Sequence, residues 1–217
     1  MDTTHVYRSE DLPTDRYMAV EGANGLIAAI ADAHSLEAAG DKILRPLTSG
    51  ALGSEAAPYD GSVALDGNLT KSLLEIIARS TAFARADLRV APASPGKAER
   101  LQPFLTHGRA TLYVNLEEAG LLCQREFTDT EAAATALLER GAARVLVTDG
   151  GRAATEADAA RLLTQEPPKV LVTRVTRAGD TFMAAHIASE RAGASRDEAL
   201  DRALLSAARY VSGETPL

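Results

Sequence analysis

Residues 62–115 read SVALDGNLTKSLLEIIARSTAFARADLRVAPASPGKAERLQPFLTHGRATLYVN. The runs SVALD, LRVAPAS and ATLYVN have the length and composition of buried strands. Between them, LTKSLLEIIARS and KAERLQPFL place apolar residues three or four positions apart, which is typical of amphipathic helices. Buried strands alternating with such helices in βαβαβ order predict a mainly parallel sheet that is flanked by helices. We therefore expect an α/β fold with three layers.

The C-terminal half continues this alternation. Residues 128–140, TDTEAAATALLER, carry a capping residue, early acids and an apolar stripe, with Gly141 just beyond, and so predict a helix. RVLVT at 144–148 predicts a further buried strand that ends in the turn Asp149-Gly150-Gly151. Two short strands are expected around 153–156 and 170–175, and closing helices over 179–191 and 195–212.

The N-terminal part has a different pattern. Residues 16–32, RYMAVEGANGLIAAIAD, contain two apolar segments around Ala23-Asn24-Gly25. An Asn-Gly pair between strand-like runs favours a β-hairpin. The Gly- and Pro-containing stretch 48–61 predicts a surface loop, and no internal repeat is present.

Composition excludes several classes of protein. A chain of 217 residues with 46% hydrophobic residues fits one globular domain. Its net charge of -7, without a run of Lys or Arg, argues against a nucleic-acid partner. One cysteine, Cys123, excludes an internal disulfide, and the N-terminus lacks a signal-peptide pattern, so a cytoplasmic location is expected. No apolar run approaches the roughly 18 to 20 residues that span a bilayer, so no membrane partner is expected.

The segment with the strongest chemical signal is 174–182, RVTRAGDTF, where a predicted strand passes through a turn of small residues into a helix. The free backbone N–H groups and the positive end of the helix dipole at such a junction favour phosphate or developing negative charge. Asp180 in the first turn is a candidate general base for phosphoryl transfer. Its alternative role is that of a helix cap.

These residues also carry a family resemblance. VTRVTRAGDTFMAA at 172–185 resembles the signature of the ribokinase-like (PfkB) carbohydrate kinases, in which a Thr-x-Gly-Ala-Gly-Asp run opens the catalytic helix. The resemblance implies that Asp180 is the catalytic base and that Thr176 contacts the nucleotide. It also implies that Arg177, Ala178 and Gly179 form the anion hole.

Two further segments follow in the order of that family. TLYVNLEEAGLL at 111–122 resembles its Asn-x-x-Glu motif, which gives Asn115 and Glu118 the role of positioning Mg²⁺ and phosphates. Mg²⁺ suits this motif because it binds through few protein ligands. VLVTDGG at 145–151 is similar to the turn beside the nucleotide, which places Thr148, Gly150 and Gly151 near ATP. Alternatively, the first segment is a polar strand end and the second an ordinary turn.

The resemblance implies a ribokinase-like three-layer sandwich with a small β lid. It would form a single kinase domain over 1–217, with the lid hairpin at 14–34 and the α/β core at 60–217. The implied activity is ATP-dependent phosphorylation of a sugar or nucleoside hydroxyl. ATP and Mg²⁺ are the implied cofactors, and a monovalent cation such as K⁺ is compatible. A homodimer through the lid is also compatible. Residues 15–36, DRYMAVEGANGLIAAIADAHSL, resemble the lid region of pseudouridine kinases.

The chain departs from the family in two places. The family's first strand with a sugar-binding Asp, its Gly-Gly segment and the helix that follows have no counterpart before Arg16, so the resemblance covers about residues 14–212. Arg177 stands where the family has a Gly. If the backbone needs a positive φ there, Arg distorts the anion site; if it does not, the guanidinium can bind phosphate. Two alternatives to an active kinase follow: a silent module that keeps the fold for binding or oligomerisation, or a part of a longer working enzyme that includes upstream residues.

Overall fold

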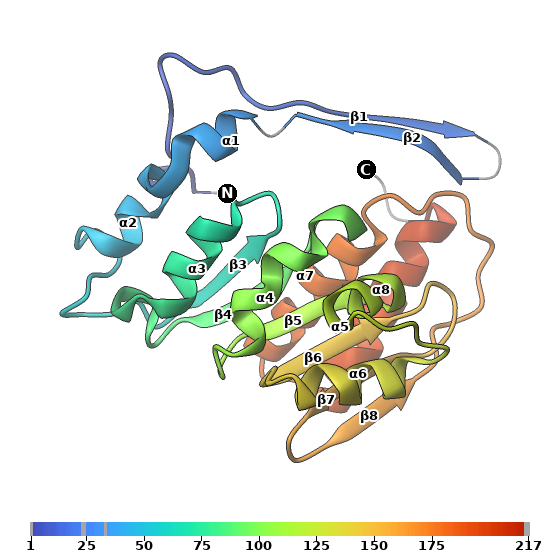
Figure 1. Cartoon of the computed structure of the whole chain (residues 1–217). Coiled ribbons are helices and arrows are strands. Elements are labelled where there is room, and N and C mark those ends of the chain that lie inside the picture. Colours follow the sequence, from blue (N-terminus) through green and yellow to red (C-terminus); the bar gives the residue numbers. More distant parts are fainter. Residues whose placement is uncertain (1, 23–24, 33, 215–217) are drawn as a thin grey trace.

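A computed structural model describes residues 2–22, 25–32 and 34–214. Strands β1 (Tyr17–Gly22) and β2 (Gly25–Ala31) pair in antiparallel fashion as a sheet of their own, which confirms the predicted hairpin. Ala23 and Asn24 of the predicted turn lie outside the described residues. The hairpin runs across one end of the molecule, above the main sheet (Figure 1).

The main sheet has six strands in the order β3-β4-β5-β6-β7-β8. Strands β3 (Ser62–Asp66), β4 (Asp87–Ala91), β5 (Thr111–Asn115) and β6 (Arg144–Thr148) pair in parallel. Strands β7 (Ala154–Asp158) and β8 (Leu162–Gln165) extend the sheet in antiparallel fashion. The expected mainly parallel sheet is confirmed, and because β3 to β6 are parallel, their carboxyl ends share one edge.

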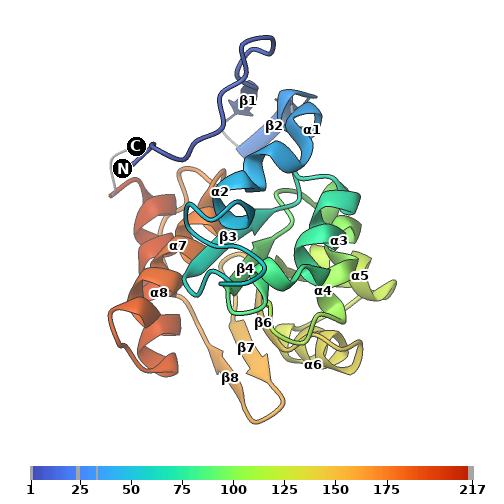
Figure 2. The ribbon, with the colours of Figure 1, turned by 90° about the vertical axis from the view of Figure 1, so that its left-hand side faces the viewer.

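Helices cover both faces of this sheet (Figure 2). One face carries α3 (Lys71–Arg79), α5 (Leu116–Cys123), α6 (Thr130–Glu139) and the segment formed by η3 (Pro95–Leu101) and α4 (Gln102–Leu105). The other face carries α7 (Ala178–Arg191) and α8 (Arg196–Ser212). The short helices α1 (His34–Ala39), η1 (Gly40–Leu44), α2 (Arg45–Thr48) and η2 (Thr81–Phe83) complete the elements.

Alternation along the strands builds a core on each face of the sheet. Leu112 and Val114 of β5 pack into the cluster beneath α3, α5 and α6. Tyr113, between them in sequence, points to the opposite face and packs with Phe182 and Leu200 of the two C-terminal helices. This two-sided burial explains why β5 appears in the sequence as one continuous apolar run.

The predicted strand at 170–175 is wrong. The last strand is β8, at Leu162–Gln165, and residues 166–177 form a connection without helix or strand instead. There the Thr173 and Arg174 N–H groups donate to the Val211 carbonyl at the end of α8, at 2.8 and 3.2 Å. The apolar residues of this segment remain exposed, with Leu171 82% accessible. The apolar composition predicted a strand, but β8 pairs with β7. Residues 170–175 therefore have no strand partner in the described part of the sheet.

The helix at 97–105 was predicted correctly in position but differs in type, because residues 95–101 adopt the tighter 3₁₀ form before one α-helical turn. Pro95 and Pro103 each stand at the first or second position of their segment, where a missing N–H costs least. Across the described residues, no helix has the length and apolarity to cross a membrane.

Candidate functional site

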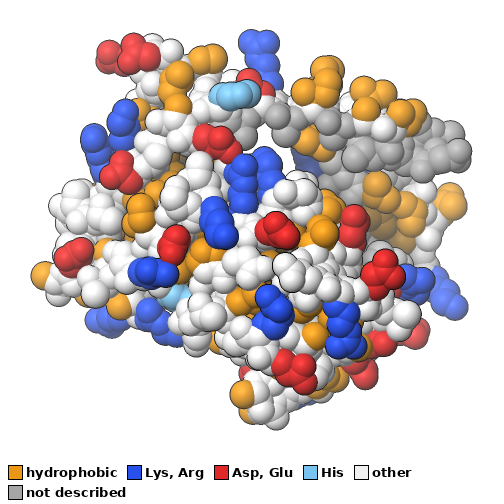
Figure 3. Space-filling view, viewed as in Figure 1, with side chains coloured by type: hydrophobic (Ala, Val, Ile, Leu, Met, Phe, Trp, Pro, Cys, Tyr) orange, Lys and Arg blue, Asp and Glu red, His pale blue; other side chains and the backbone are white. Residues whose placement is uncertain are grey.

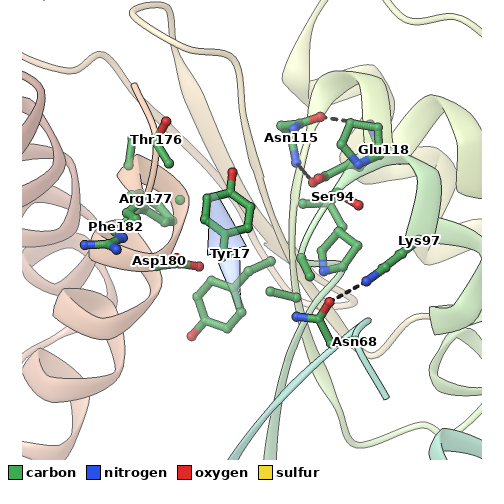
Figure 4. A pocket seen from close by; sticks show the side chains of 18 of the residues that line it. Tyr17, Asn68, Ser94, Lys97, Asn115, Glu118, Thr176, Arg177, Asp180 and Phe182 are labelled. Atoms are coloured by element: carbon green, nitrogen blue, oxygen red, sulfur yellow. Dashed lines mark hydrogen bonds between the residues drawn. The ribbon is translucent and has the colours of Figure 1, made fainter. Parts of the chain in front are cut away.

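A cavity of about 750 Å³ lies between the hairpin and the carboxyl ends of β3 to β6. Its walls come from the hairpin, the ends of four strands and the first turn of α7 (Figure 4). Loops after parallel strands meet at such an edge, which is where ligands of open α/β sheets bind. Residues that are far apart in the sequence, such as Asp15 and Phe182, thus line a single cavity.

The first turn of α7 forms one wall. Asp180 is exposed and lines the cavity together with Thr176, Ala178 and Gly179. The Ala178 N–H donates to the Val175 carbonyl at 3.1 Å, and the N-cap residue Arg177 makes no side-chain capping bond within the described part of the chain. The N–H groups that follow in the first turn have no intrahelical acceptor by the geometry of a helix. This wall can therefore receive an anion.

Arg177 adopts the left-handed conformation, with φ 71° and ψ 8°. This is the backbone that a Gly adopts at little cost and that an L side chain adopts with strain. Of the two alternatives for Arg177, the structure shows the first, a backbone with a positive φ. The backbone keeps the turn that a Gly would make, while the exposed guanidinium lines the same cavity.

Asn115 and Glu118 form a second wall and hold each other in a capping box at the start of α5. Asn115 Oδ1 accepts from the Glu118 N–H, and Glu118 Oε2 accepts from the Asn115 N–H, both at 2.8 Å. Burial raises the pKa of Glu118 above its usual range, and the hydrogen bond from Asn115 offsets this only in part. The predicted pair thus lies in the cavity with one carboxylate oxygen, Oε1, outside the capping box.

Only part of the turn after β6 contributes to the cavity wall. Thr148 lines the cavity, whereas Gly150 and Gly151 do not. Gly150 has φ 57°, and the Arg152 guanidinium closes the turn on the Asp149 carboxylate at 2.7 and 2.9 Å. Of the three nucleotide residues predicted here, the structure brings only Thr148 to the other site residues.

Sequence reasoning missed the wall formed by the ends of β3 and β4. Asn68, Ser94 and Lys97 line the cavity opposite Asp180, and Tyr17 of the hairpin lies between the two sides (Figure 4). A signal was available, because Asn68 and Lys97 each follow directly after a predicted parallel strand. Neither residue belongs to one of the motifs described in the sequence.

Comparison with known proteins places the chain in a family. The profile described as "pfkB family carbohydrate kinase" matches residues 1–214, which is wider than the expected 14–212. No curated protein gives a significant match.

Solved structures give the same answer for the fold. The chain is similar to a carbohydrate kinase from Agrobacterium tumefaciens, with 25% identity and a TM-score of 0.70 over 91% of this chain and 62% of that one. It is also similar to a ribokinase from Thermotoga maritima, with 19% identity and a TM-score of 0.70 over 92% and 64%.

A ribokinase from Arabidopsis thaliana, solved with ribose and ATP, has 21% identity and a TM-score of 0.70 over 92% of this chain and 63% of that one. The chain therefore spans a little under two thirds of the length of these structures. Its fold is ribokinase-like, as expected from the sequence. With the family profile matched over nearly its whole length, the chain belongs to the pfkB family of carbohydrate kinases.

Proposed function

We propose that the chain is an ATP-dependent kinase that phosphorylates a hydroxyl of a sugar or nucleoside, with Asp180 as the general base. One observation carries the proposal: Asn115, Glu118, Thr148 and Asp180, far apart in sequence, line one cavity. Thr176 and the 177–179 turn line it too. Membership of the pfkB family supports the same reaction class.

The reaction that follows from this geometry needs few protein groups. Asp180 accepts the proton of the attacking hydroxyl as the O–P bond forms and the bond to the leaving nucleotide breaks. The backbone N–H groups of Gly179 and Asp180 and the Arg177 guanidinium stabilise the negative charge that develops on the transferring group. Thr148 and Thr176 would contact the nucleotide, with Gly150 and Gly151 beside it.

The donor set around Asn115 and Glu118 fits a magnesium ion held through water. Glu118 Oε2 is engaged by the Asn115 N–H, which leaves Oε1 for a metal-bound water. A single carboxylate suits Mg²⁺, because this ion keeps several of its waters and takes few direct protein ligands. When bound, Mg²⁺ would neutralise the phosphate charge. K⁺ remains a further compatible ion.

The finer parts of the proposal rest on the sequence. They are a single kinase domain over 1–217 with the lid at 14–34 and the core at 60–217, a cytoplasmic location, and a lid similar to that of pseudouridine kinases. A homodimer through the lid belongs here too. Its motivation is the exposure of Met18, Val20 and Ile30, at 56%, 47% and 62%, on the hairpin.

The decisive experiment compares the full chain with its Asp180→Asn variant. ATP consumption is measured with Mg²⁺ and a panel of sugars and nucleosides, and ATP binding is measured by calorimetry. We expect turnover to fall by at least about a thousandfold with ATP affinity retained, because the base is lost without a change in size. Equal turnover by the variant would refute the role of Asp180.

A second candidate is a silent module of kinase fold. The strained backbone of Arg177 in the anion turn favours it. A silent module would bind no ATP and gain no resistance to unfolding from ATP with Mg²⁺. The same calorimetry separates the two candidates.

A further inference from the structure

The proposed function divides the cavity into two parts. Phosphoryl transfer places the attacking and leaving oxygens on opposite sides of the transferred group. The predicted nucleotide residues lie at the end of β6 and before α7, which packs on β5. The acceptor must then lie on the other side of Asp180, over the ends of β3 and β4. Asn68, Ser94 and Lys97 form the wall there (Figure 4).

Lys97 is held in a fixed position on this wall. Its Nζ donates to Asn68 Oδ1 at 2.5 Å. Asn68 is itself fixed by Asp66, whose two carboxylate oxygens accept from the Asn68 N–H and Nδ2, both at 2.9 Å. A Cβ on Gly67 would lie 3.2 Å from Lys97 Cβ and 2.8 Å from the Pro92 carbonyl oxygen, so the turn packs directly against the base of the lysine.

The turn behind Lys97 is reinforced as well. Arg100 Nη1 donates to the carbonyls of Gly67, Asn68 and Leu69, at 3.2, 3.3 and 3.2 Å. It also pairs with Glu37 of α1 at 3.0 Å. The neighbouring Ala93 has φ 55°, a strained value for a residue with a side chain. Strain of this kind is retained where the surrounding structure enforces it, and it clusters at ligand sites.

Charged side chains of both signs line the cavity, and Asp180 takes part in no salt bridge among the described residues. Within the described residues, none of the cations that line it, Arg16, Lys97 and Arg177, takes part in a salt bridge. The Asp15 carboxylate is engaged by the Ser35 and Leu36 N–H groups at 2.9 Å, and Asp32 by His34 at 2.7 Å. On this face, beneath the hairpin, Lys and Arg side chains lie interspersed with Asp and Glu side chains (Figure 3).

Lys97 therefore presents an ammonium whose one described partner is a neutral amide. It is partly buried, and an ammonium forms a stronger hydrogen bond with a charged acceptor than with a neutral one. We infer that the wall formed by Asn68, Ser94 and Lys97 is a subsite for an anionic group on the acceptor, so that the substrate is a sugar phosphate or a sugar acid rather than a neutral sugar. The inference rests on the proposed function for the placement of the acceptor.

The test uses the full chain and three ligands that share one sugar: glucose, glucose 1-phosphate and gluconate. Each retains a primary hydroxyl, and the two anionic ligands separate a phosphate from a carboxylate. Calorimetry gives their affinities for the unchanged chain and for Lys97→Met, Lys97→Arg and the control Lys71→Met. Lys71 is exposed on α3 and does not line the cavity.

We expect one anionic ligand to bind the unchanged chain at least about tenfold more tightly than glucose, as one charge-assisted hydrogen bond provides. Lys97→Met should abolish this preference, Lys97→Arg should retain most of it, and Lys71→Met should leave it unchanged. A preference for phosphate alone identifies a sugar phosphate, and a preference for gluconate alone a sugar acid.

Three results would overturn the inference: equal affinity for neutral and anionic ligands, no binding of any of them, or a preference that survives in Lys97→Met. A preference that survives in Lys97→Met would place the anion beside Arg177. These outcomes are independent of the kinase assignment. An enzyme that phosphorylates neutral sugars with Asp180 as base refutes the anionic subsite alone, whereas an intact Lys97-dependent preference without ATP binding refutes the kinase alone.

Discussion

Glu190 Oε2 accepts a hydrogen bond from Arg89 Nη1 at 2.6 Å, which joins the last turn of α7 to the middle of β4. Its other oxygen accepts from Arg144 Nη2 of β6, also at 2.6 Å. Asp180 lies at the opposite end of the same helix, above the carboxyl edge of the sheet. The position of the proposed base relative to the strands therefore depends on a charged contact at the far end of α7.

We predict that Glu190→Gln lowers the free energy of unfolding by about 1 to 3 kcal/mol, because it removes one of the two carboxylates with which each of Arg89 and Arg144 pairs, Asp87 and Glu156 being the others. Urea unfolding followed by circular dichroism measures the change. Glu139→Gln, on the exposed end of α6, is the matched control and should change stability by less than about 0.5 kcal/mol. Similar values for the two variants would contradict the role of this contact.

A pH effect is expected from the same network at Glu156, whose side chain is fully buried. Burial alone would raise the pKa of Glu156, but His186 and the Arg144 and Arg196 guanidinium groups outweigh it and lower that pKa to about 2. His186 Nε2 lies 3.4 Å from Glu156 Oε2, and neither atom has a hydrogen bond to another described residue. The arginine contacts, at 2.9 and 2.5 Å to Oε1, are therefore the firmer cause.

Because the folded-state pKa of Glu156 lies below the unfolded value, its contribution is present above about pH 4.5 and is lost as pH falls toward 2. We predict that stability falls in this window, by on the order of 3 kcal/mol from this group. Urea midpoints between pH 6 and 2.5 measure it. Glu156→Gln should flatten the profile, and an unchanged slope would show that other carboxylates dominate.

Arg177 provides a test of backbone strain. We predict that Arg177→Gly is more stable than Arg177→Ala by about 1 kcal/mol, because only Gly adopts φ 71° without strain. Both variants remove the guanidinium, so both should weaken ATP binding equally if the side chain binds phosphate. Thermal unfolding and calorimetry with ATP and Mg²⁺ separate the two effects. Equal stability of the variants would contradict the strain.

The capping box links helix stability to the proposed metal site. We predict that Asn115→Ala lowers the free energy of unfolding by about 1 kcal/mol through loss of the N-cap. The bond from the Asn115 backbone N–H to Glu118 Oε2 survives this change, so we expect Mg²⁺-dependent ATP binding to weaken only through loss of the Asn115 amide itself. Asn115→Asp keeps an oxygen at the cap and should restore most of the stability. If Asn115→Ala loses stability but binds ATP unchanged, the pair is structural only.

The outer face of the hairpin gives a prediction for assembly. Met18 pairs with Ile30, and both side chains are exposed; Figure 3 shows apolar side chains on the side of the hairpin away from the body. We predict a dimer in sedimentation equilibrium that Ile30→Lys converts to a monomer. Ile76→Lys, at a residue 52% exposed on α3, should remain dimeric. A monomeric unchanged chain would refute the lid dimer.

The order of elements was predictable because strands and helices are set by local periodicity. SVALD, RVLVT and the 128–140 helix were placed correctly since their apolar spacing is visible in the sequence itself. The 170–175 segment was not, because its apolar run fits a strand wherever a partner exists. β8 pairs with β7 because a short connection joins the two strands. Composition alone does not reveal this pairing.

By itself, the sequence determined the fold class, and its motifs singled out candidate site residues: Asp180 with its turn, Asn115 with Glu118, and Thr148. Only the tertiary structure decided that they share a cavity with Lys97 and Asn68, and that Gly150 and Gly151 do not line it. The physical reason is that a parallel sheet brings the carboxyl ends of distant strands to one edge. Which side chains meet there depends on strand order, register and the backbone angles of turns such as those at Ala93 and Arg177, and these are properties of the packed chain.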